Sequence, residues 1–381
     1  MSVMENRAGF FIKQPSGYSS FKPKPLPPEN PSVHFDAEMM ALMSTAERLL
    51  GRLDGVTQTL PNPALFVAMY VQKEAVLSSQ IEGTQASLSD VLGEISEKRE
   101  DISEVSQYVA AMNYGLRRLK DLPLSLRLLR EIHSVLLKQG RGSERNPGEF
   151  RTSQNWIGPQ GCTLMNATFV PPAVPDMREA LGDLELFINS DTLNDLPLVK
   201  IALVHAQFES IHPFLDGNGR MGRLLITFWL CQQQILSQPL LYLSYYFKKN
   251  RISYYENLMK VRKEGDWETW IKFFLTGVAE VSDEATQTAK DILALKEECE
   301  KIIAFRSNLN DQKFLDALFE RPIISKREVA ELLGVTDVTA GRIVDDFCKL
   351  NILEDATPGK QRYKKFAFSK YIDLLNRGTE I

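Results

Sequence analysis

The sequence from residue 212 to residue 223 reads His212-Pro213-Phe214-Leu215-Asp216-Gly217-Asn218-Gly219-Arg220-Met221-Gly222-Arg223. Glycine at positions 217 and 219 permits positive φ angles and lets a ligand come close to the backbone. Free N–H groups in such a turn form a nest for an anion. An apolar helix is expected from Arg220 to Gln234, and its dipole would turn its positive end toward the same point. The stretch therefore predicts a polyphosphate site at the start of a buried helix.

The side chains of this stretch add reactive groups to the nest. Arg220 and Arg223 are three residues apart on one helix face, so both guanidinium groups can bind phosphate oxygens. Asp216 supplies a hard carboxylate that suits Mg²⁺ shared with phosphates. His212 can accept a proton near neutral pH. Singly, such residues are common in structural roles, but together in one short loop they indicate transfer of a phosphorus-centred group.

The same residues match the signature of Fic-domain proteins at every specified position, and the resemblance extends from about Pro61 to Val278. It implies an all-α helical bundle with a small β-hairpin flap. Known members of the family mostly transfer AMP from ATP to Ser, Thr or Tyr hydroxyls. Members that transfer phosphate instead carry Lys in place of Gly219. The resemblance thus implies a protein adenylyltransferase that uses ATP and Mg²⁺.

The resemblance also implies a role for each residue of the loop. His212 would take the proton from the target hydroxyl, and Asp216 would hold Mg²⁺ against the α- and β-phosphates. The phosphates themselves would be bound by Gly217, Asn218 and Gly219 in the nest and by Arg220 and Arg223 at the β- and γ-phosphates.

A second motif, Ser78-Ser79-Gln80-Ile81-Glu82-Gly83, resembles the inhibitory motif of one regulated class of the family. It ends a helix expected from Pro61 to Gly83. By resemblance, Ser78, Glu82 and Gly83 form the motif, and the Glu82 carboxylate pairs with Arg223 where the γ-phosphate would bind. An ordinary helix that ends in Glu-Gly is the structural alternative. We expect Glu82 to inhibit the transfer.

Two further segments resemble substrate-contacting parts of the family. Phe150–Ile157 and Thr163–Val170 are typical of the strands of a β-hairpin with a longish turn. In the family this hairpin is a flap, and an exposed strand edge at Ile157 and Gly158 could dock a target peptide. A purely structural hairpin remains the alternative. Tyr254 and Tyr255 fall where relatives place an aromatic pair beside the nucleobase, although core packing explains them equally well.

The chain divides into four parts by pattern. Residues 1–60 hold an N-terminal arm and a helix, and Gly17–Pro31 is an extended arm that could be ordered or disordered. The Fic domain is expected at 61–280. A connecting helix at 281–308 and a C-terminal domain at 309–381 follow. Helical patterns dominate the rest: Ser103–Lys120, Ser125–Lys138, Val174–Asn189, Pro197–Ser210, Trp267–Val278 and Ser282–Phe305.

The sequence pattern of the C-terminal domain predicts a winged helix-turn-helix. Helices are expected at Ser325–Leu333 and Thr336–Leu350, and strands at Ile352–Leu353 and Arg362–Phe368. Such a module can bind DNA, but basic and acidic residues nearly balance in it, while DNA affinity depends on phosphate neutralisation. DNA binding is therefore possible but not favoured, and a protein contact or dimerisation is preferred.

Composition and charge limit the kind of protein and the cellular compartment that we expect. The 381 residues carry a formal net charge of −4, which argues against a surface built wholly for nucleic acid. Four scattered cysteines favour the cytoplasm over a disulfide framework or a zinc site. No signal peptide or membrane span is apparent in the sequence. His205, His34 and His133 lack a convergent carboxylate pattern and are taken as structural.

Two other functions stay open beside AMP transfer. The chain could be a winged-helix transcriptional regulator whose Fic domain senses nucleotide without turnover. It could also remove AMP from modified targets, with Glu82 positioning water. The target protein is unknown, and self-modification and a homodimer are both compatible with the sequence.

Overall fold

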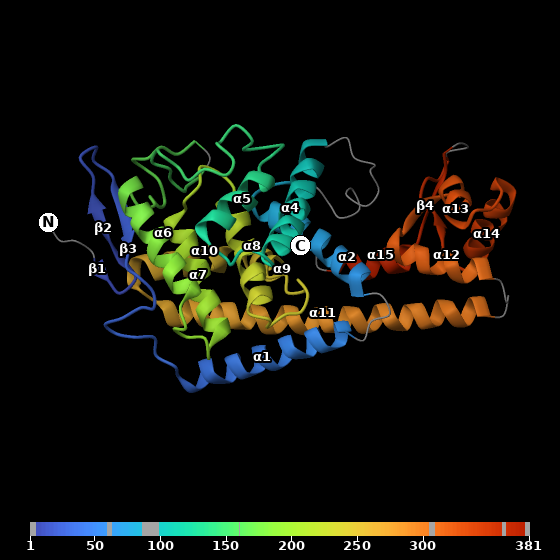
Figure 1. The fold of residues 1–381 in the computed structure, drawn as a ribbon, viewed down its shortest axis with the longest axis horizontal. Helices are drawn as coiled ribbons and strands as arrows, with labels where there is room; N and C mark the ends of the chain where they lie inside the picture. The colour runs from blue at the N-terminus through green and yellow to red at the C-terminus, as the bar shows by residue number, and fades with distance from the viewer. Residues whose placement is uncertain are drawn as a thin grey trace.

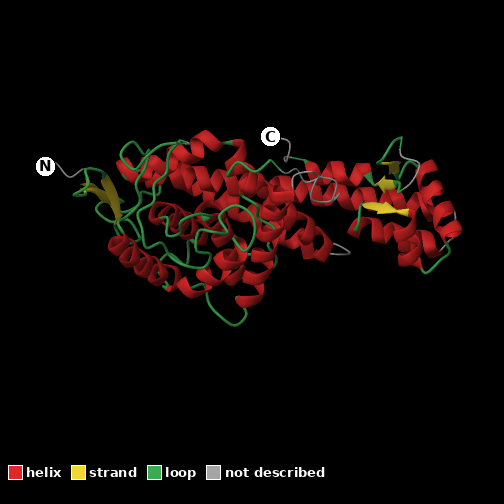
Figure 2. Ribbon diagram, turned by 90° about the horizontal axis from the view of Figure 1, so that it is seen from above, coloured by secondary structure: helices red, strands yellow, loops and turns green. Residues whose placement is uncertain are grey.

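The computed structural model describes residues 5–58, 63–85, 99–159, 161–304, 309–359 and 363–377. Helices form nearly all of the regular structure, and the strands drawn lie near the two ends of the molecule (Figure 2). This confirms the predicted all-α class. None of the described helices is long and apolar enough to cross a membrane. The helices of the main body are α1 Ala37–Gln58, α2 Pro63–Ile81, α4 Arg99–Arg118, α5 Leu126–Leu136, α6 Val174–Asn189, α7 Pro197–Ile211, α8 Asn218–Gln232, α9 Ser244–Lys249, α10 Arg251–Glu264 and α11 Trp267–Ala304.

Helices α7 and α8 form the centre of the body, with α4, α5, α6 and α10 around them (Figure 1). Every residue of α7 from Leu198 to Ile211 is buried, as is nearly all of α8. A helix that is apolar on all sides belongs in the middle of a bundle. Pro197 begins α7 at a position where the missing N–H costs nothing. The loop between these two buried helices is the 212–217 loop, so its backbone is fixed at both ends.

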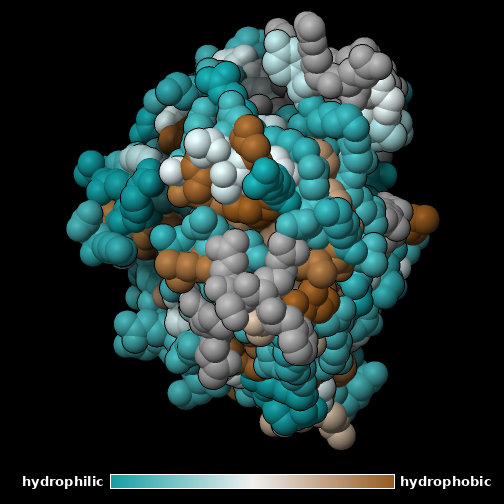
Figure 3. Space-filling model, turned by 90° about the vertical axis from the view of Figure 1, so that its right-hand side faces the viewer, coloured by the Kyte–Doolittle hydropathy of each residue, from teal (hydrophilic) through white to brown (hydrophobic). Residues whose placement is uncertain are grey.

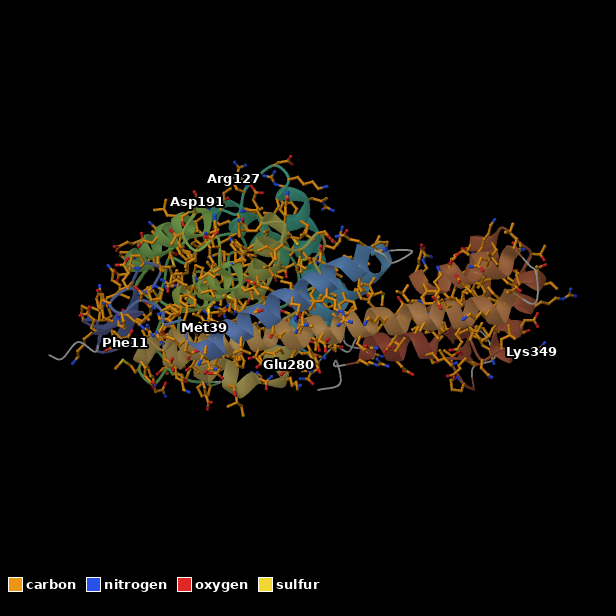
Figure 4. The ribbon with its side chains drawn as sticks, turned by 90° about the horizontal axis from the view of Figure 1, so that it is seen from below. Phe11, Met39, Arg127, Asp191, Glu280 and Lys349 are labelled. Atoms are coloured by element: carbon orange, nitrogen blue, oxygen red, sulfur yellow. The ribbon has the colours of Figure 1, made fainter. Side chains whose placement is uncertain are left out.

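Helix α11 is one continuous helix of 38 residues. The prediction of separate helices at 267–278 and 282–305 was wrong, because no helix breaker follows Val278 and the buried stripe continues through Val281 and Ala285. Helix α1 packs along α11 at the base of the molecule (Figure 1). Figure 4 labels Met39 and Glu280 on these neighbouring helices. The expected boundary at residue 280 thus falls inside a helix that joins both ends of the molecule.

The N-terminal arm is ordered, which was one of the two alternatives left open by the sequence. Strands β1 Glu5–Asn6, β2 Gly9–Lys13 and β3 Ser19–Pro23 form an antiparallel sheet in the order β1-β2-β3. The sheet attaches to the body where the N–H of Phe21 donates to the carbonyl oxygen of Val170 at 2.9 Å. Figure 4 places Phe11 of β2 at one end of the molecule. The sequence analysis did not predict this sheet.

The predicted hairpin is a loop closed by a single bridge. Ile157 and Phe169 exchange two N–H···O=C bonds of 2.8 and 3.0 Å, and this is an isolated bridge between the two segments. The prediction of full strands over 150–157 and 163–170 was wrong. The reason is that other backbone groups find other partners. The N–H of Arg151, for example, donates to the loop that follows α7. We keep the name flap for residues 150–172.

The C-terminal lobe, residues 309–377 as described, continues from α11. Its elements are α12 Leu309–Glu320, β4 Ile323–Ser325, α13 Lys326–Leu333, α14 Asp337–Lys349, β5 Glu354–Asp355, β6 Lys365–Ala367 and α15 Ser369–Asn376, with a sheet in the order β4-β6-β5. Ser325 and Glu328 form a capping box at α13, which Gly334 ends with a φ of 65°. The first strand was predicted two residues too early, and β4 and α15 were not predicted.

The helix-turn-helix order of α13 and α14 suits the winged-helix prediction, which stays a prediction, as does DNA binding. Lysines near α14 are engaged within the lobe: Lys326 pairs with Asp345 at 2.6 Å and Lys349 with Asp346 at 3.1 Å. Figure 3, which looks onto the end of the molecule that this lobe forms, shows a mostly hydrophilic face with scattered apolar side chains. Two basic residues at or just before the start of the predicted strand Arg362–Phe368, Lys360 and Arg362, lie outside the described residues.

Candidate active site

The 212–217 loop turns through two left-handed residues. His212 ends α7 with a φ of 48°, and Gly217 precedes α8 with a φ of 76°. The first N–H groups of a helix have no partner within the helix, and no side chain caps α8. Positions 218 to 220 therefore offer backbone donors to an anion. The predicted set was 217 to 219, but the N–H of Gly217 donates to Asp216 Oδ1 at 2.6 Å.

The Asn218 side chain braces this loop rather than reaching into the site. Its Oδ1 accepts the N–H of Phe214 at 2.8 Å, and its Nδ2 donates to the carbonyl oxygen of Phe214 at 2.9 Å. The residue is buried. Asn218 can thus contribute to phosphate binding through its backbone only.

Replacing Asn218 by Ala should destabilise the protein by about 1–3 kcal/mol, because the buried N–H of Phe214 loses its partner. The carbonyl oxygen of Phe214 still accepts a hydrogen bond from Asn155 at 2.9 Å. Urea unfolding monitored by circular dichroism would measure the loss of stability. Asn113→Ala, at an exposed position of α4, is the matched control. An Asn218→Ala midpoint equal to that of the control would contradict the bracing role.

Three residues outside the loop also hold it in place. Arg151 donates from Nε to the carbonyl oxygen of His212 at 3.1 Å, and Asn155 donates to the same oxygen at 3.1 Å. The ring of His133 stacks on Phe214 at a centroid distance of 3.7 Å, with Nε2 3.0 Å from Asp216 O. Burial lowers the pKa of His133 to about 4, so the ring is neutral. His133 has a structural role, as expected, but its contacts with the 212–217 loop were not predicted from the sequence.

Arg220 is buried at the start of α8, and its guanidinium is only weakly paired with the nearby carboxylates. Nη1 lies 3.5 Å from Glu104 and Nη2 lies 3.6 Å from Asp216. None of its three guanidinium nitrogens makes a hydrogen bond among the described residues. A buried guanidinium without hydrogen bonds is costly, so Arg220 is a ready partner for an anionic ligand.

Arg223 is fully engaged by the end of α2. Its Nε donates to Ser78 Oγ at 2.8 Å, and its Nη2 donates to Ser78 O at 2.9 Å and to Glu82 Oε1 at 2.8 Å. Burial raises the pKa of Glu82, but Arg223 more than offsets this and the pKa lies below its usual value. Gly83 follows with a φ of 100° and ends the turn. The contact that the resemblance implies is therefore present.

The Glu82 carboxylate also lies against the phosphate nest. A Cβ added to Gly219 would be only 2.3 Å from Glu82 Oε1. Glycine at this position thus lets a carboxylate, or a phosphate, approach the backbone. In this structure an anionic oxygen of the protein itself occupies that place.

A cavity of about 280 Å³ opens beside the loop. His212, Arg223 and Glu82 line one side, and Ile157 and Gly158 of the flap line another. The remaining lining residues are Trp156, Glu209, Gly219, Tyr254, Tyr255, Leu258 and Arg262. The residues predicted for the base, for inhibition by Glu82 and for target docking thus meet at one hollow with two predicted phosphate-binding residues, Gly219 and Arg223. The lining residues do not include Asp216, Gly217, Asn218 or Arg220.

The aromatic pair divides between core and surface. Tyr254 is 1% exposed, and its hydroxyl lies 2.9 Å from His205 Nε2. Tyr255 is 39% exposed at the same cavity. Tyr254 therefore packs in the core, and of the two tyrosines only Tyr255 offers an accessible ring. His205 is a buried histidine of the core, as expected.

Models of two parts of one family match this sequence. Residues 40–117 match the Fic/DOC family N-terminal model, and residues 123–230, which contain the whole 212–223 stretch, match the Fic/DOC family model. The chain is a Fic-domain protein. The first match contains the α2 motif and the second contains His212, so the Glu82–Arg223 contact joins the two matched parts.

Named relatives include two adenylyltransferases. Over 165 residues the chain is 30% identical to a protein adenylyltransferase Fic of Drosophila grimshawi, and equally to one of Drosophila mojavensis. The match covers 43% of this chain and 30% and 29% of those relatives, so the chain spans less than a third of their length.

Two solved structures share the fold. A Fic family protein from Desulfovibrio desulfuricans superposes with a TM-score of 0.57 over 88% of this chain and 97% of the other, at 18% identity. A Fic domain-containing signaling protein from Bacteroides thetaiotaomicron gives 0.50 over 67% and 97%, also at 18%. The Fic bundle described above is therefore a known architecture.

The electrostatic setting of His212 in the Fic domain keeps its ring neutral. Burial lowers its pKa to about 3, with Arg262 and Arg151 acting in the same direction and Glu82 opposing them. A neutral imidazole can accept a proton, which a base requires. Arg262, which the sequence analysis did not single out, stacks over Phe169 and donates to Glu209 O at 2.9 Å.

Asp216 fits a shared magnesium ion. Its carboxylate is partly exposed beside Arg220, and Oδ1 accepts the N–H of Gly217 at 2.6 Å. Among the described residues no three His, Cys, Asp or Glu side chains converge on a metal site. Mg²⁺ commonly binds through one or two carboxylates together with substrate phosphates and water. Asp216 next to the nest of the Fic domain offers that arrangement.

Proposed function

We propose that this chain transfers AMP from ATP to a Ser, Thr or Tyr hydroxyl of a target protein or of itself, and releases pyrophosphate. The observation that supports it most directly is that one cavity is lined by the neutral, half-buried imidazole of His212 and by Gly219 and Arg223 of α8. The relatives named protein adenylyltransferase agree with this chemistry.

In the proposed reaction, the N–H groups at positions 218–220 and the Arg220 guanidinium bind the phosphates of ATP. His212 takes the proton of the target hydroxyl. The hydroxyl oxygen then forms a bond to the α-phosphorus while the bond to pyrophosphate breaks in line. Asp216 would hold Mg²⁺, which neutralises charge on the phosphates when it is bound. Gly219 leaves room for the nucleotide, whereas phosphate-transferring members of the family carry Lys there.

Inhibition by Glu82 is the second part of the proposal. The carboxylate engages Arg223 at 2.8 Å and lies against Gly219. A γ-phosphate at Arg223 would bring negative charge to the same place, so the two anions compete. Glu82 would therefore keep ATP from its reactive position until it moves away.

The flap is proposed to dock the target. Gly158 and Ile157 line the cavity, and Trp156 beside them is 43% exposed. An extended peptide could add its backbone hydrogen bonds to the free edge of this segment. The hydroxyl of its side chain would then face His212.

Labelled ATP distinguishes the possible reactions. The wild type and Glu82→Gly would be incubated with Mg²⁺ and ATP labelled at the α- or the γ-phosphate, with and without cell lysate. Protein that retains α-label supports AMP transfer, and retained γ-label means phosphate transfer instead. If no variant retains label, AMP-modified protein offered as substrate tests AMP removal. Salt-dependent retention on DNA without any label would favour the transcriptional regulator.

A further inference from the structure

Glu209 is a buried carboxylate at the active-site cavity that the reaction above does not use. It lies one helical turn before His212 on α7 and is 6% exposed. Its Oε2 is 4.0 Å from His212 Nδ1. Oε1 has no hydrogen-bond partner among the described residues, and neither does His212 Nδ1. The carboxylate and the ring nitrogen thus lie close enough to pair after a small movement.

The surroundings fix the carboxylate beside the ring. Oε1 would be only 2.4 Å from a Cβ added to Gly222, so the carboxylate lies against the backbone of α8. The charged groups that face it are Arg223 of α8, Arg262 of α10 and Glu82 after α2. Burial raises the pKa of Glu209 to about 7, while Arg223 and Arg262 oppose the rise. The charged form is therefore accessible near neutral pH.

We propose that the Glu209 carboxylate is a positioning group for His212. It accepts a hydrogen bond from Nδ1–H, and so holds the imidazole in the tautomer whose Nε2 lone pair is free for the target hydroxyl. When Nε2 takes the hydroxyl proton, the carboxylate offsets the positive charge of the ring. The proton leaves later to solvent, and Glu209 keeps its own state throughout. A contact of 4.0 Å closes to a hydrogen bond by a small side-chain movement, as catalytic contacts of unliganded enzymes often do.

The backbone carbonyl of Glu209 is the competing partner. It also faces the ring and raises the pKa of His212, and it accepts a hydrogen bond from Arg262 at 2.9 Å. Substitutions of the Glu209 side chain leave this carbonyl in place. They therefore separate a role of the carboxylate from one of the backbone.

The inference rests on the proposed function, so the first test is kinetic. In the Glu82→Gly background, Glu209→Gln should lower kcat for AMP transfer by about 10- to 100-fold, with KM for ATP nearly unchanged. The acidic limb of the pH–rate profile should move to lower pH, because the ring loses the carboxylate that raised its proton affinity. Gln207→Ala, a buried change on the same helix, is the control. A rate and a profile equal to those of the control would overturn the proposal.

The second test needs no catalysis. The chain has four histidines, so ¹⁵N-histidine labelling yields four pairs of ring-nitrogen signals, and His212→Ala assigns the pair of interest. We expect the Nδ1–H tautomer in the wild type and a shift toward Nε2–H in Glu209→Ala. Gly222→Ala, which displaces the carboxylate without removing it, should shift the tautomer in the same direction. An unchanged tautomer in both variants would assign the role to the carbonyl and end the proposal. If the tautomer shifts but no variant transfers AMP, only the proposed function fails.

Discussion

Glu82→Ala should transfer AMP about 5- to 150-fold faster than the wild type, the usual range of a coupling between two states. The Glu82 carboxylate accepts a hydrogen bond from Arg223 at 2.8 Å and also lies against Gly219, where a phosphate would approach the backbone. With Glu82 removed, Ser78 still binds Arg223 through Oγ and O, so the guanidinium stays in position for a phosphate. ATP affinity should rise in the same variant. Retained α-label and calorimetric titration with ATP would measure the two effects.

Two controls separate the charge from the shape of Glu82. Glu82→Gln keeps the size of the side chain but removes the charge, and we expect an intermediate rate. Glu280→Ala removes an exposed carboxylate of α11 and should leave the rate at the wild-type level. If Glu82→Ala lowers the melting temperature without raising the rate, the contact stabilises the fold and does not inhibit the enzyme.

His212→Ala should reduce AMP transfer by about 100- to 10,000-fold when it is made in the Glu82→Gly background, because the target hydroxyl loses its base. Binding of ATP should change little, since in the proposed reaction the phosphates are held by the N–H groups at 218–220 and by Arg220. Single-turnover labelling gives the rate, and calorimetry gives the affinity. His34→Ala, at a histidine outside the cavity lining, is the matched control.

The pH dependence follows from the same residue. A base must be deprotonated to act, and burial lowers the pKa of His212 to about 3 in this structure. The ring is therefore neutral at neutral pH, and its own protonation removes the base as the pH falls through the pKa of the ring. Phosphates bound nearby would raise that pKa and move the loss to higher pH. Equal rates for His212→Ala and the His34→Ala control would remove His212 from the mechanism.

Several elements could be predicted because their signals are local. Helix α6 has the predicted bounds of Val174–Asn189, and α7 begins at the predicted Pro197. A proline in the first turn and an apolar stripe in the following turns fix such helices over a few residues. Gly217 needs a positive φ, which its own type permits, and it adopts 76°. Elements of this kind do not depend on distant partners.

Other elements depend on partners that are far away in the chain. Strands β1, β4 and β5 have two or three residues each, too few for an alternating pattern, and pairing with their neighbours defines them. The continuity of α11 depends on α1, against which its buried stripe packs. The flap residues pair only once because the N–H of Arg151 bonds to the 212–217 loop instead.

The 212–223 stretch could be identified without any structure, since His212, Asp216, Gly217, Gly219, Arg220 and Arg223 lie within twelve consecutive residues whose geometry is set by two glycines and a helix start. The residues that surround this stretch became known from the folded chain. Glu82 reaches Arg223 across 141 residues of chain, and Glu104, His133 and Arg262 arrive from three other helices. These groups meet because the apolar faces of their helices pack together. Their distances follow from how the apolar faces of the helices pack, and no short stretch of sequence contains that information.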